Sequence, residues 1–311
     1  MNIVFFGTPD FAAEFLSALY ADGQISVVAV VAQPDKPVGR KQVLTPPPTK
    51  TLAVLHTIPV FQPASLKDET FADQLRALKP DVCVIVAYGK IIPQTILDIP
   101  VHGNINVHPS KLPMYRGPSP LQAAIAAGDM ETAVSIMLID DKMDHGPILA
   151  QETIQMTPTE TPETLREKVV GVGAPLLVET VKQFVAGKVT PTPQNHENAT
   201  FCKLLTKDDG KIDWTQPAEI IERKVRAYTP WPGTWTHIDG VTYKIHQVAI
   251  DQEIRSMLLG PGDVKILDKI LLIGSGSTPI RIEEIQPEGK ARMDVKSFIN
   301  GNAGIDGARA R

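Results

Sequence analysis

Short apolar runs alternate along the first half of the chain with segments in which apolar residues recur at helical spacing. Continuous apolar runs at 2–6, 25–32 and 81–87 are typical of strands that are buried on both faces of a parallel sheet. Between them, residues 9–20 and 69–78 carry the spacing of amphipathic helices. The alternation predicts an α/β fold, with a doubly wound and mostly parallel sheet that is covered by helices on both faces.

More strands and a long helix follow in the same half. The apolar pattern predicts a short strand that ends at His108, a strand over 133–139 and an alternating strand over 148–156. Residues 163–185 are expected to form a long helix, and Pro162 is a typical residue for its first turn.

The chain changes character after this helix. Residues 190–206 combine two prolines with Thr, Asn, Gln and Glu and show little periodicity, which is typical of a linker. Beyond it, a helical segment precedes a series of short strand patterns, with a hairpin signal at Asp239–Gly240. The helix is expected over 218–228, and the strands over 234–238, 241–249, 264–267, 270–273 and 280–285. We therefore expect a first domain over 1–189, a linker over 190–206 and a second domain, a small β-barrel, over 207–311.

Composition limits the class of protein without identifying it. A length of 311 residues suggests about two domains, and 43% apolar with 21% charged residues is typical of soluble globular proteins. The net charge of −4 neither supports nor excludes a nucleic-acid partner, because the local distribution of charge decides that. Two cysteines, the lack of a basic leader and the lack of an apolar run near ~20 residues predict a cytoplasmic protein without a membrane helix.

Candidate chemistry is concentrated between residues 104 and 146. Asn106 and His108 are two apart on a predicted strand, so both side chains point to one face. Such a pair at the carboxyl end of a strand lies where α/β folds place their ligand crevice. Taken alone, the pair is more typical of a polar loop whose histidine caps a backbone group.

Asp144 makes a functional site more plausible than an ordinary polar loop. It lies on a loop, residues 140–146, that leaves the next predicted strand, and we expect this loop at a comparable edge of the sheet. An amide and an imidazole can donate hydrogen bonds to the oxyanion of an acyl transfer. A carboxylate can hold the imidazole or accept the proton that an attacking amine loses. Asn106, His108 and Asp144 therefore form a plausible constellation for direct acyl transfer, with no serine or cysteine nucleophile.

The motifs around these residues resemble a known family. Residues 106–110 (NVHPS) and 112–117 (LPMYRG) resemble the signature of the folate-dependent formyltransferases, and 143–149 (MDHGPIL) is similar to that family's aspartate loop. The resemblance implies that Asn106, His108 and Asp144 are catalytic, and that 10-formyltetrahydrofolate is the formyl donor. It also implies that the second domain is an OB-like barrel.

The resemblance further implies a folate site. The loop 86–93 (VAYGKIIP) is similar to the loop that walls the pteridine pocket in the family, partly through backbone groups. Ordinary loop packing around Ile91 and Ile92 is the alternative. The residues expected to bind folate are Tyr88, Gly89, Lys90, Ile91, Ile92, Ser110, Leu112 and Pro113.

Three other stretches resemble those members of the family that formylate methionyl initiator tRNA. They are residues 6–12 (FGTPDFA), the basic segment 33–50 and residues 226–233 (RAYTPWPG). The basic segment has five prolines and one acid, and positive charge near the crevice would suit a phosphate backbone; a solvated loop is the alternative. We expect Lys36, Arg40 and Lys41 to contact the tRNA, although Lys41 replaces the family's usual glycine.

Two alternative functions remain open. A formyltransferase that acts on an amino sugar nucleotide would share Asn106, His108 and Asp144, and a non-catalytic folate- or RNA-binding module would not need them. The histidines and cysteines lack metal-ligand spacing, so no metal is expected. The turn Gly7-Thr8-Pro9 lacks the G-x-G-x-x-G spacing, which argues against a dinucleotide cofactor. We expect a monomer.

Overall fold

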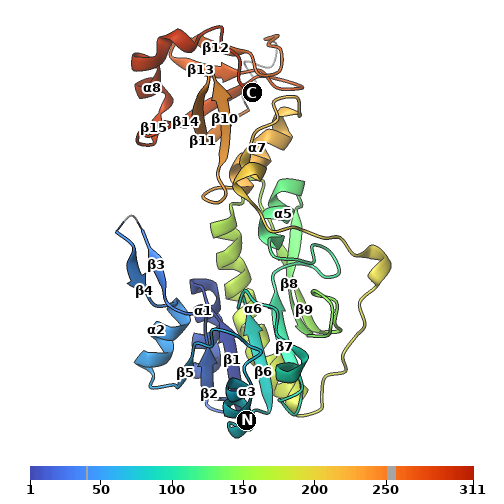
Figure 1. Ribbon diagram of the computed structural model, residues 1–311. Coiled ribbons are helices and arrows are strands. Elements are labelled where there is room, and N and C mark those ends of the chain that lie inside the picture. The colour runs from blue at the N-terminus through green and yellow to red at the C-terminus, as the bar shows by residue number, and fades with distance from the viewer. Residues whose placement is uncertain (40, 251–256) are drawn as a thin grey trace. The chain divides into compact units, whose positions relative to one another are not determined.

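The computed structural model describes residues 1–39, 41–250 and 257–311 (Figure 1). These residues pack into two compact units, each assembled from separate stretches of chain. The first unit comprises 1–117, 131–155 and 166–201, and the second comprises 118–130, 156–165 and 202–311. Arg40, one of the expected tRNA contacts, lies outside the described residues.

The first unit is built on a seven-stranded sheet with the strand order β5-β2-β1-β6-β7-β8-β9. The first five strands in this order run parallel, whereas β8 is antiparallel to both β7 and β9. The predicted, mostly parallel sheet is therefore confirmed. The strands are β1 (Asn2–Gly7), β2 (Ser26–Val31), β5 (Val60–Phe61), β6 (Val82–Val86), β7 (Asn104–His108), β8 (Glu131–Leu138) and β9 (Ile148–Gln155).

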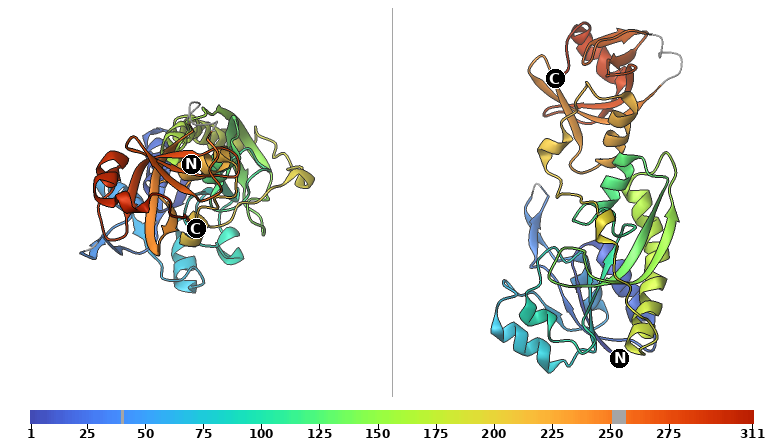
Figure 2. Two further views of the ribbon diagram at one scale, coloured as in Figure 1. Left: turned by 90° about the horizontal axis from the view of Figure 1, so that it is seen from above. Right: turned by 90° about the vertical axis from the view of Figure 1, so that its right-hand side faces the viewer.

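Helices cover both faces of this sheet, as the turned views show (Figure 2). On one face, Val4 and Phe6 of β1 share a buried cluster with residues of α3 and α4. On the other, α6 packs closely on α1 and β8, because a Cβ added to Gly173 would lie 3.1 Å from Phe15 and 2.9 Å from Val134. The helices are α1 (Asp10–Ala21), α3 (Glu69–Ala77), α4 (Gln94–Leu97) and α6 (Pro162–Val185).

The direction of β8 corrects one expectation from the sequence. Because β8 is antiparallel to β7, its last residue, Leu138, pairs with Ile105 near the start of β7. The loop that carries Asp144 therefore does not leave the sheet at the edge where β7 ends, and it must return along the sheet to reach His108. An apolar run does not reveal the direction of its strand, so the pattern of residues did not fix this edge.

The basic segment 33–50 is not a simple loop. Strands β3 (Lys36–Val38) and β4 (Val43–Thr45) pair as an antiparallel hairpin, and α2 (Pro48–Leu55) follows after two intervening residues. Lys50 lies in the first turn of α2, where its ammonium group is 2.8 Å from the carboxylate of Asp35. Its charge is thus compensated within the fold.

The second unit contains an antiparallel sheet with the order β10-β11-β14-β13-β12, and β15 pairs with β14. This confirms the predicted β-rich second domain. The strands are β10 (Thr234–Ile238), β11 (Val241–Ala249), β12 (Val264–Leu267), β13 (Ile270–Ile273), β14 (Ile280–Pro287) and β15 (Met293–Asp294). The helices of this unit include α5 (Pro120–Ala127), α7 (Ala218–Ala227) and α8 (Val295–Asn302).

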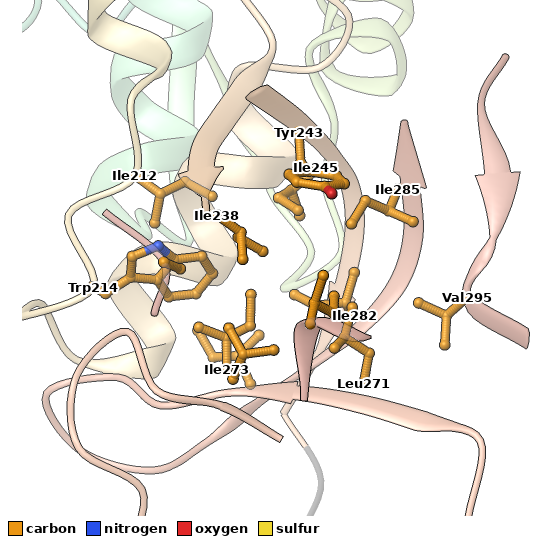
Figure 3. Close-up of a cluster of buried hydrophobic side chains, with 14 of the residues drawn as sticks. Ile212, Trp214, Ile238, Tyr243, Ile245, Leu271, Ile273, Ile282, Ile285 and Val295 are labelled. Carbon is orange, nitrogen blue, oxygen red and sulfur yellow. The ribbon is translucent and has the colours of Figure 1, made fainter. Parts of the chain in front are cut away.

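A buried apolar cluster joins this sheet to α7 and α8 (Figure 3). Ile245, Leu271 and Ile282 are at most 1% exposed within it, and full burial of a side chain of this size stabilises a fold by about 1.5–3 kcal/mol. Trp214 also lies in the cluster, and its indole N–H donates to the hydroxyl of Thr236 at 2.9 Å. The one polar atom of that ring is therefore satisfied inside an apolar core.

The last residues of the chain connect the two edge strands of the sheet. Ala310 bridges to Ile238 of β10, and Arg309 bridges to Asp263 next to β12. Backbone hydrogen bonds follow the same route, with 2.9 Å from the Arg311 N–H to the His237 carbonyl and 2.7 Å from the Ala310 N–H to the Gly262 carbonyl. The chain thereby bridges to a residue of one edge strand and to a residue next to the other, which leaves less of both edges unpaired.

Candidate active site

His108 is the last residue of β7 and is only 4% exposed. Its Nε2 lies 2.9 Å from the carbonyl oxygen of Tyr115. Because a carbonyl can only accept, Nε2 carries a hydrogen and donates it. The other ring nitrogen, Nδ1, lies 3.6 Å from Oδ2 of Asp144, which is longer than a hydrogen bond and typical of catalytic groups before a substrate binds.

The position of Asp144 depends on a tight return of its loop. A Cβ added to Gly146 would lie 2.0 Å from the carbonyl oxygen of Leu138, so only glycine allows the loop to pass so close to the end of β8. Asp144 itself has a φ of 48°, in the left-handed region. Its Oδ2 accepts a hydrogen bond of 2.8 Å from the N–H of Gly117, which fixes the carboxylate beside the imidazole.

Asn106 lies two residues before His108 on β7, so both side chains point to the same face of the strand. Its backbone sits between β6 and β8, paired with Ile85 and Met137. The side chain is half-buried, and within the described part of the chain its amide has no hydrogen-bond partner. The structure thus brings His108 and Asp144 together and leaves the amide of Asn106 available on the same face.

The loop after β7 is held in place by polar side chains from the neighbouring strands. The hydroxyl of Ser135 on β8 donates to the carbonyl of Ser110 at 2.6 Å, and the amide of Gln151 on β9 donates to the carbonyl of Leu112 at 3.1 Å. The hydroxyl of Ser110 donates to the carbonyl of Met114 at 2.6 Å. Ser110 and Leu112 are buried, and Pro113 follows a cis peptide bond. These three expected folate residues therefore shape the loop that presents Tyr115 to His108.

The other expected folate residues follow β6. Because β6 pairs in parallel with β7, the loop that begins at Ala87 leaves the sheet at the same edge as His108. The carbonyl of Tyr88 accepts hydrogen bonds of 3.2 Å from Thr8 and from Gln33. Its phenol oxygen is buried without a partner among the described residues, and burial raises the pKa of Tyr88 to about 12.

The rest of this loop is more exposed. Gly89 has a φ of 81°, which favours glycine, and Lys90 donates to the carbonyl of Ala64 at 3.1 Å. Ile91 is 89% exposed, while Ile92 packs partly against the apolar cluster of the sheet. Ordinary core packing therefore accounts for Ile92 but not for Ile91.

Lys36 and Lys41 lie on the β3–β4 hairpin and are exposed. No side-chain partner of either lysine occurs among the described residues. They are free positive charges at the surface of the first unit. The hairpin also exposes apolar side chains, with Val43 at 59% and Leu44 at 64%.

Several polar residues around His108 and Asp144 are not evident from the sequence. The amide of Gln194, in the segment expected as a linker, donates to the carbonyls of Asp144 and Gly146 at 3.0 and 2.7 Å. Arg116 is 3% exposed and donates to Gln194 and to His196. The polar, aperiodic composition of this segment gives no sign of such contacts. The one signal was Arg116, an ionisable residue inside the NVHPS–LPMYRG motif.

Within residues 1–39, 41–250 and 257–311, no group of three or more His, Cys, Asp or Glu side chains is arranged to hold a metal ion. No helix there is both long and apolar enough to cross a membrane. Among the described residues, neither Cys83 nor Cys202 forms a disulfide.

Two family models match most of the chain. The one described as formyl transferase matches residues 1–181, and the one described as formyl transferase, C-terminal domain, matches residues 204–303.

Curated relatives match over nearly the full length. The chain is 42% identical over 301 residues to the methionyl-tRNA formyltransferase of Chloroflexus aurantiacus, covering 97% of each chain. It is 41% identical over 302 residues to the methionyl-tRNA formyltransferase of Myxococcus xanthus, covering 97% of this chain and 95% of the relative.

Solved structures share the fold at lower identity. HypX from Aquifex aeolicus, in complex with tetrahydrofolic acid, has a TM-score of 0.62 at 18% identity, over 96% of this chain and 46% of HypX. WlaRD, a sugar 3N-formyl transferase, has a TM-score of 0.66 at 17% identity, over 94% of this chain and 99% of WlaRD. With both family models and relatives about 40% identical along its length, the chain belongs to the formyl transferase family and, within it, to the group of the methionyl-tRNA formyltransferases.

Proposed function

We propose that this protein transfers the formyl group of 10-formyltetrahydrofolate to the free amino group of methionyl initiator tRNA, giving N-formylmethionyl-tRNA for translation initiation. The observation that carries the proposal is the approach of Asp144 to within 3.6 Å of the His108 imidazole, in a chain of this family. The proposed acceptor is the one for which the relatives from Chloroflexus aurantiacus and Myxococcus xanthus are named, methionyl-tRNA. Enzymes that formylate amino sugars share only the fold, at 17% identity, so no specific observation favours that acceptor.

The proposed chemistry is a direct attack of the amine on the formyl carbon. A new C–N bond forms, the bond to the folate nitrogen breaks, and negative charge develops on the formyl oxygen. The amide of Asn106, which has no hydrogen-bond partner among the described residues, is suited to donate a hydrogen bond to that oxygen. The Nε2–H of His108 is already directed at Tyr115, so donation from His108 would come from a proton on Nδ1.

Asp144 has two tasks in this scheme. Its carboxylate orients the His108 ring from the Nδ1 side, and it accepts, directly or through water, the proton that the amine loses. That proton finally passes to the folate nitrogen that leaves. The Gly117 N–H holds Oδ2 in place at 2.8 Å during these steps, so the carboxylate does not need to reorganise.

The folate site is proposed at the edge of the sheet next to His108. Tyr88, Gly89, Lys90, Ile91 and Ile92 come from the loop after β6, and Ser110, Leu112 and Pro113 from the loop after β7. The parallel pairing of β6 with β7 supports a shared site. The exposed Ile91 and the unpartnered phenol of Tyr88 are features that a bound ring system would account for.

The proposed tRNA contacts are Lys36 and Lys41 on the hairpin, with Arg40 between them in sequence. Two observations support these contacts: Lys36 and Lys41 are exposed, and neither has a side-chain partner among the described residues. We propose that residues 1–189 form the catalytic domain, 190–206 the linker and 207–311 the domain that positions tRNA. A monomer in the cytoplasm, without a metal, completes the proposal.

The test is formylation of methionyl initiator tRNA by the purified protein with 10-formyltetrahydrofolate. We expect formylmethionine to form, and the variant His108→Ala to lower kcat by about two to four decades, as for other general acid–base residues. The matched control is His56→Ala, whose ring stacks on Tyr20 away from these residues. Near-wild-type turnover in His108→Ala would exclude the mechanism, and transfer to amino sugars without transfer to tRNA would exclude the acceptor.

A further inference from the structure

We propose that residues 192–201, expected from sequence as linker, act as a brace that positions His108 and Asp144, with Gln194 as its central positioning residue. This inference rests on the proposed catalytic roles of these two residues. It assigns a part in catalysis to a segment that does not contain any of the three proposed catalytic side chains.

Gln194 is 6% exposed, and every polar atom of its side chain has a partner. Its Oε1 accepts hydrogen bonds from Arg116, at 2.6 Å from Nη2 and 3.2 Å from Nε. Its Nε2 donates to the carbonyl of Asp144 at 3.0 Å and to that of Gly146 at 2.7 Å. One amide therefore connects the loop after β7, through Arg116, with the carbonyls of the residues on both sides of His145.

The two residues whose oxygens face the nitrogens of the His108 ring, Tyr115 and Asp144, have left-handed backbones. Asp144 has a φ of 48° and Tyr115 a φ of 58°. Residues other than glycine keep such conformations only where surrounding contacts hold them. The two positions that set the orientation of the imidazole are thus the ones that most need external support.

The brace supplies this support at both positions. Gln194 holds the carbonyl of Asp144, as described. At the other end of the segment, the hydroxyl of Thr200 accepts from the N–H of Tyr115 at 2.8 Å, and its carbonyl accepts from the N–H of Arg116 at 2.9 Å. The segment therefore forms hydrogen bonds with both Tyr115 and Asp144, the residues whose oxygens face the imidazole.

Two more contacts fasten the same segment to the aspartate loop. The ring of His196 stacks on that of His145, with centroids 3.9 Å apart and planes 6° from parallel. Thr192 and Ile148 exchange two backbone hydrogen bonds of 2.8 Å. Residues 192–201 therefore contact the aspartate loop at several positions, and Gln194 is the residue that bonds to Asp144 itself.

The expected consequence of losing the Gln194 donors is a change in geometry and not in substrate binding. Without them, the peptide of Asp144 is free to leave the left-handed region, which moves the carboxylate away from Nδ1. A displacement of about 1 Å at a catalytic group typically costs about a hundredfold in rate. Groups that only bind substrate would instead change KM.

The variant that tests this is Gln194→Glu, which has the same shape and keeps an acceptor for Arg116 but cannot donate to the two carbonyls. We expect kcat to fall by about ten- to a hundredfold, with KM for folate donor and tRNA within about threefold of wild type. The matched control is Asn198→Ala, an exposed amide of the same segment, for which wild-type kcat is expected. Unchanged kcat in Gln194→Glu would overturn the brace, while a loss in His108→Ala would leave the proposed function standing.

A double variant separates positioning from a general loss of structure. If Gln194 acts through His108, Gln194→Glu lowers kcat much less in a His108→Ala background than in the wild type. If both losses multiply in full, Gln194 acts independently of His108 and the inference is wrong.

A second measurement does not depend on activity or on the identity of the acceptor. The N–H of Gly117 donates to Asp144 Oδ2, so its hydrogen exchange reports the position of the carboxylate. We expect exchange of this amide to accelerate by about tenfold or more in Gln194→Glu and not in Asn198→Ala. Equal exchange in the three proteins would overturn the brace even if the wild type formylates tRNA as proposed, and accelerated exchange would support it even if the acceptor were another amine.

Discussion

The imidazole of His108 shows how a single side chain can be fixed by backbone groups. Its Nε2–H is directed at the Tyr115 carbonyl, which leaves Nδ1 as the nitrogen that faces Asp144. Exchange of His108 for asparagine or glutamine would keep a donor but not two ring nitrogens in opposite directions. The same residue thus serves two neighbours, and the geometry of both follows from the loops after β7 and β8.

At His196, a single side chain is expected to make the free energy of unfolding depend on pH. Desolvation first, and then the charges of His145 and Arg116, lower the pKa of His196 below its usual value of 6.5. Arg116 also donates to its Nδ1 at 2.8 Å, a bond that protonation of Nδ1 would remove. The folded protein therefore binds a proton at His196 less readily than the unfolded chain does.

The sign of the effect follows from this difference. Below about pH 6.5 the unfolded chain binds more protons at this position, so the free energy of unfolding falls as pH drops through 6.5 towards the lowered pKa of the folded state. We expect the unfolding midpoint to fall less steeply between about pH 7.5 and about pH 5.5 in His196→Asn than in the wild type. Denaturant unfolding across this range measures it, and parallel pH profiles for the two proteins would contradict it.

At the scale of elements, the lysines of the β3–β4 hairpin differ from the lysine of the helix that follows it. Lys36 and Lys41 lie on the hairpin without side-chain partners among the described residues, whereas Lys50 in α2 is paired with Asp35. Only the first two are then available to a phosphate backbone. The lysine pair at the hairpin, and not the basic composition of the whole segment 33–50, is the proposed determinant of tRNA affinity.

We expect the double variant Lys36→Ala, Lys41→Ala to raise KM for tRNA by about tenfold and to leave KM for the folate donor unchanged. If each lysine neutralises one phosphate, the slope of log KM against log salt also falls by about two. Steady-state kinetics at several salt concentrations measure both quantities. The matched control is Lys67→Ala, another exposed lysine of the first unit, and an equal effect there would point to non-specific charge instead.

The elements also show what the sequence can and cannot predict. Strands β1, β6 and β7 and helix α6 were predictable within a few residues because apolar spacing follows from burial. The hairpin was not, since Pro37 within β3 and the exposed Leu44 break the usual strand pattern. Helix α8 begins with an Asp294 cap that bonds the N–H of Ser297 at 3.0 Å, but at eight residues it is too short for a clear periodicity.

The proposed site also contains some features that the sequence predicts and others that it does not. Asn106 and His108 could be placed on one face because a strand alternates with a period of two residues. The approach of Asp144 depends on an antiparallel β8, on Gly146 and on Gln194, about 50 residues away in sequence. Contacts of that kind come from tertiary structure and leave no local pattern.

At the scale of the whole molecule, the compact units do not follow the order of the chain. Helix α5 lies well inside residues 1–189, yet it belongs to the same unit as α7 and the antiparallel sheet. Arg223 of α7 donates to the carbonyl of Ala127 at 3.1 Å, and Arg226 donates to that of Glu160 at 2.6 Å. A Cβ on Gly128, which ends α5 with a φ of 81°, would meet the Arg223 guanidinium at 2.4 Å. These contacts tie α5 to α7 more closely than a boundary at the linker implies.

This interleaving predicts which parts of the full-length protein open together. Ile221 of α7 is 2% exposed in the core of the second unit, and Ile221→Ala should cost about 2–5 kcal/mol there. In native-state hydrogen exchange, we expect amides of α5 to accelerate together with those of α7 and β13, while β1 and β6 keep their protection. The matched variant Leu75→Ala, in the core of the first unit, should do the reverse, accelerating β1 and β6 but not α5. If α5 instead follows β6 in both variants, residues 1–189 open as one cooperative domain and the linear division of the chain is the physical one.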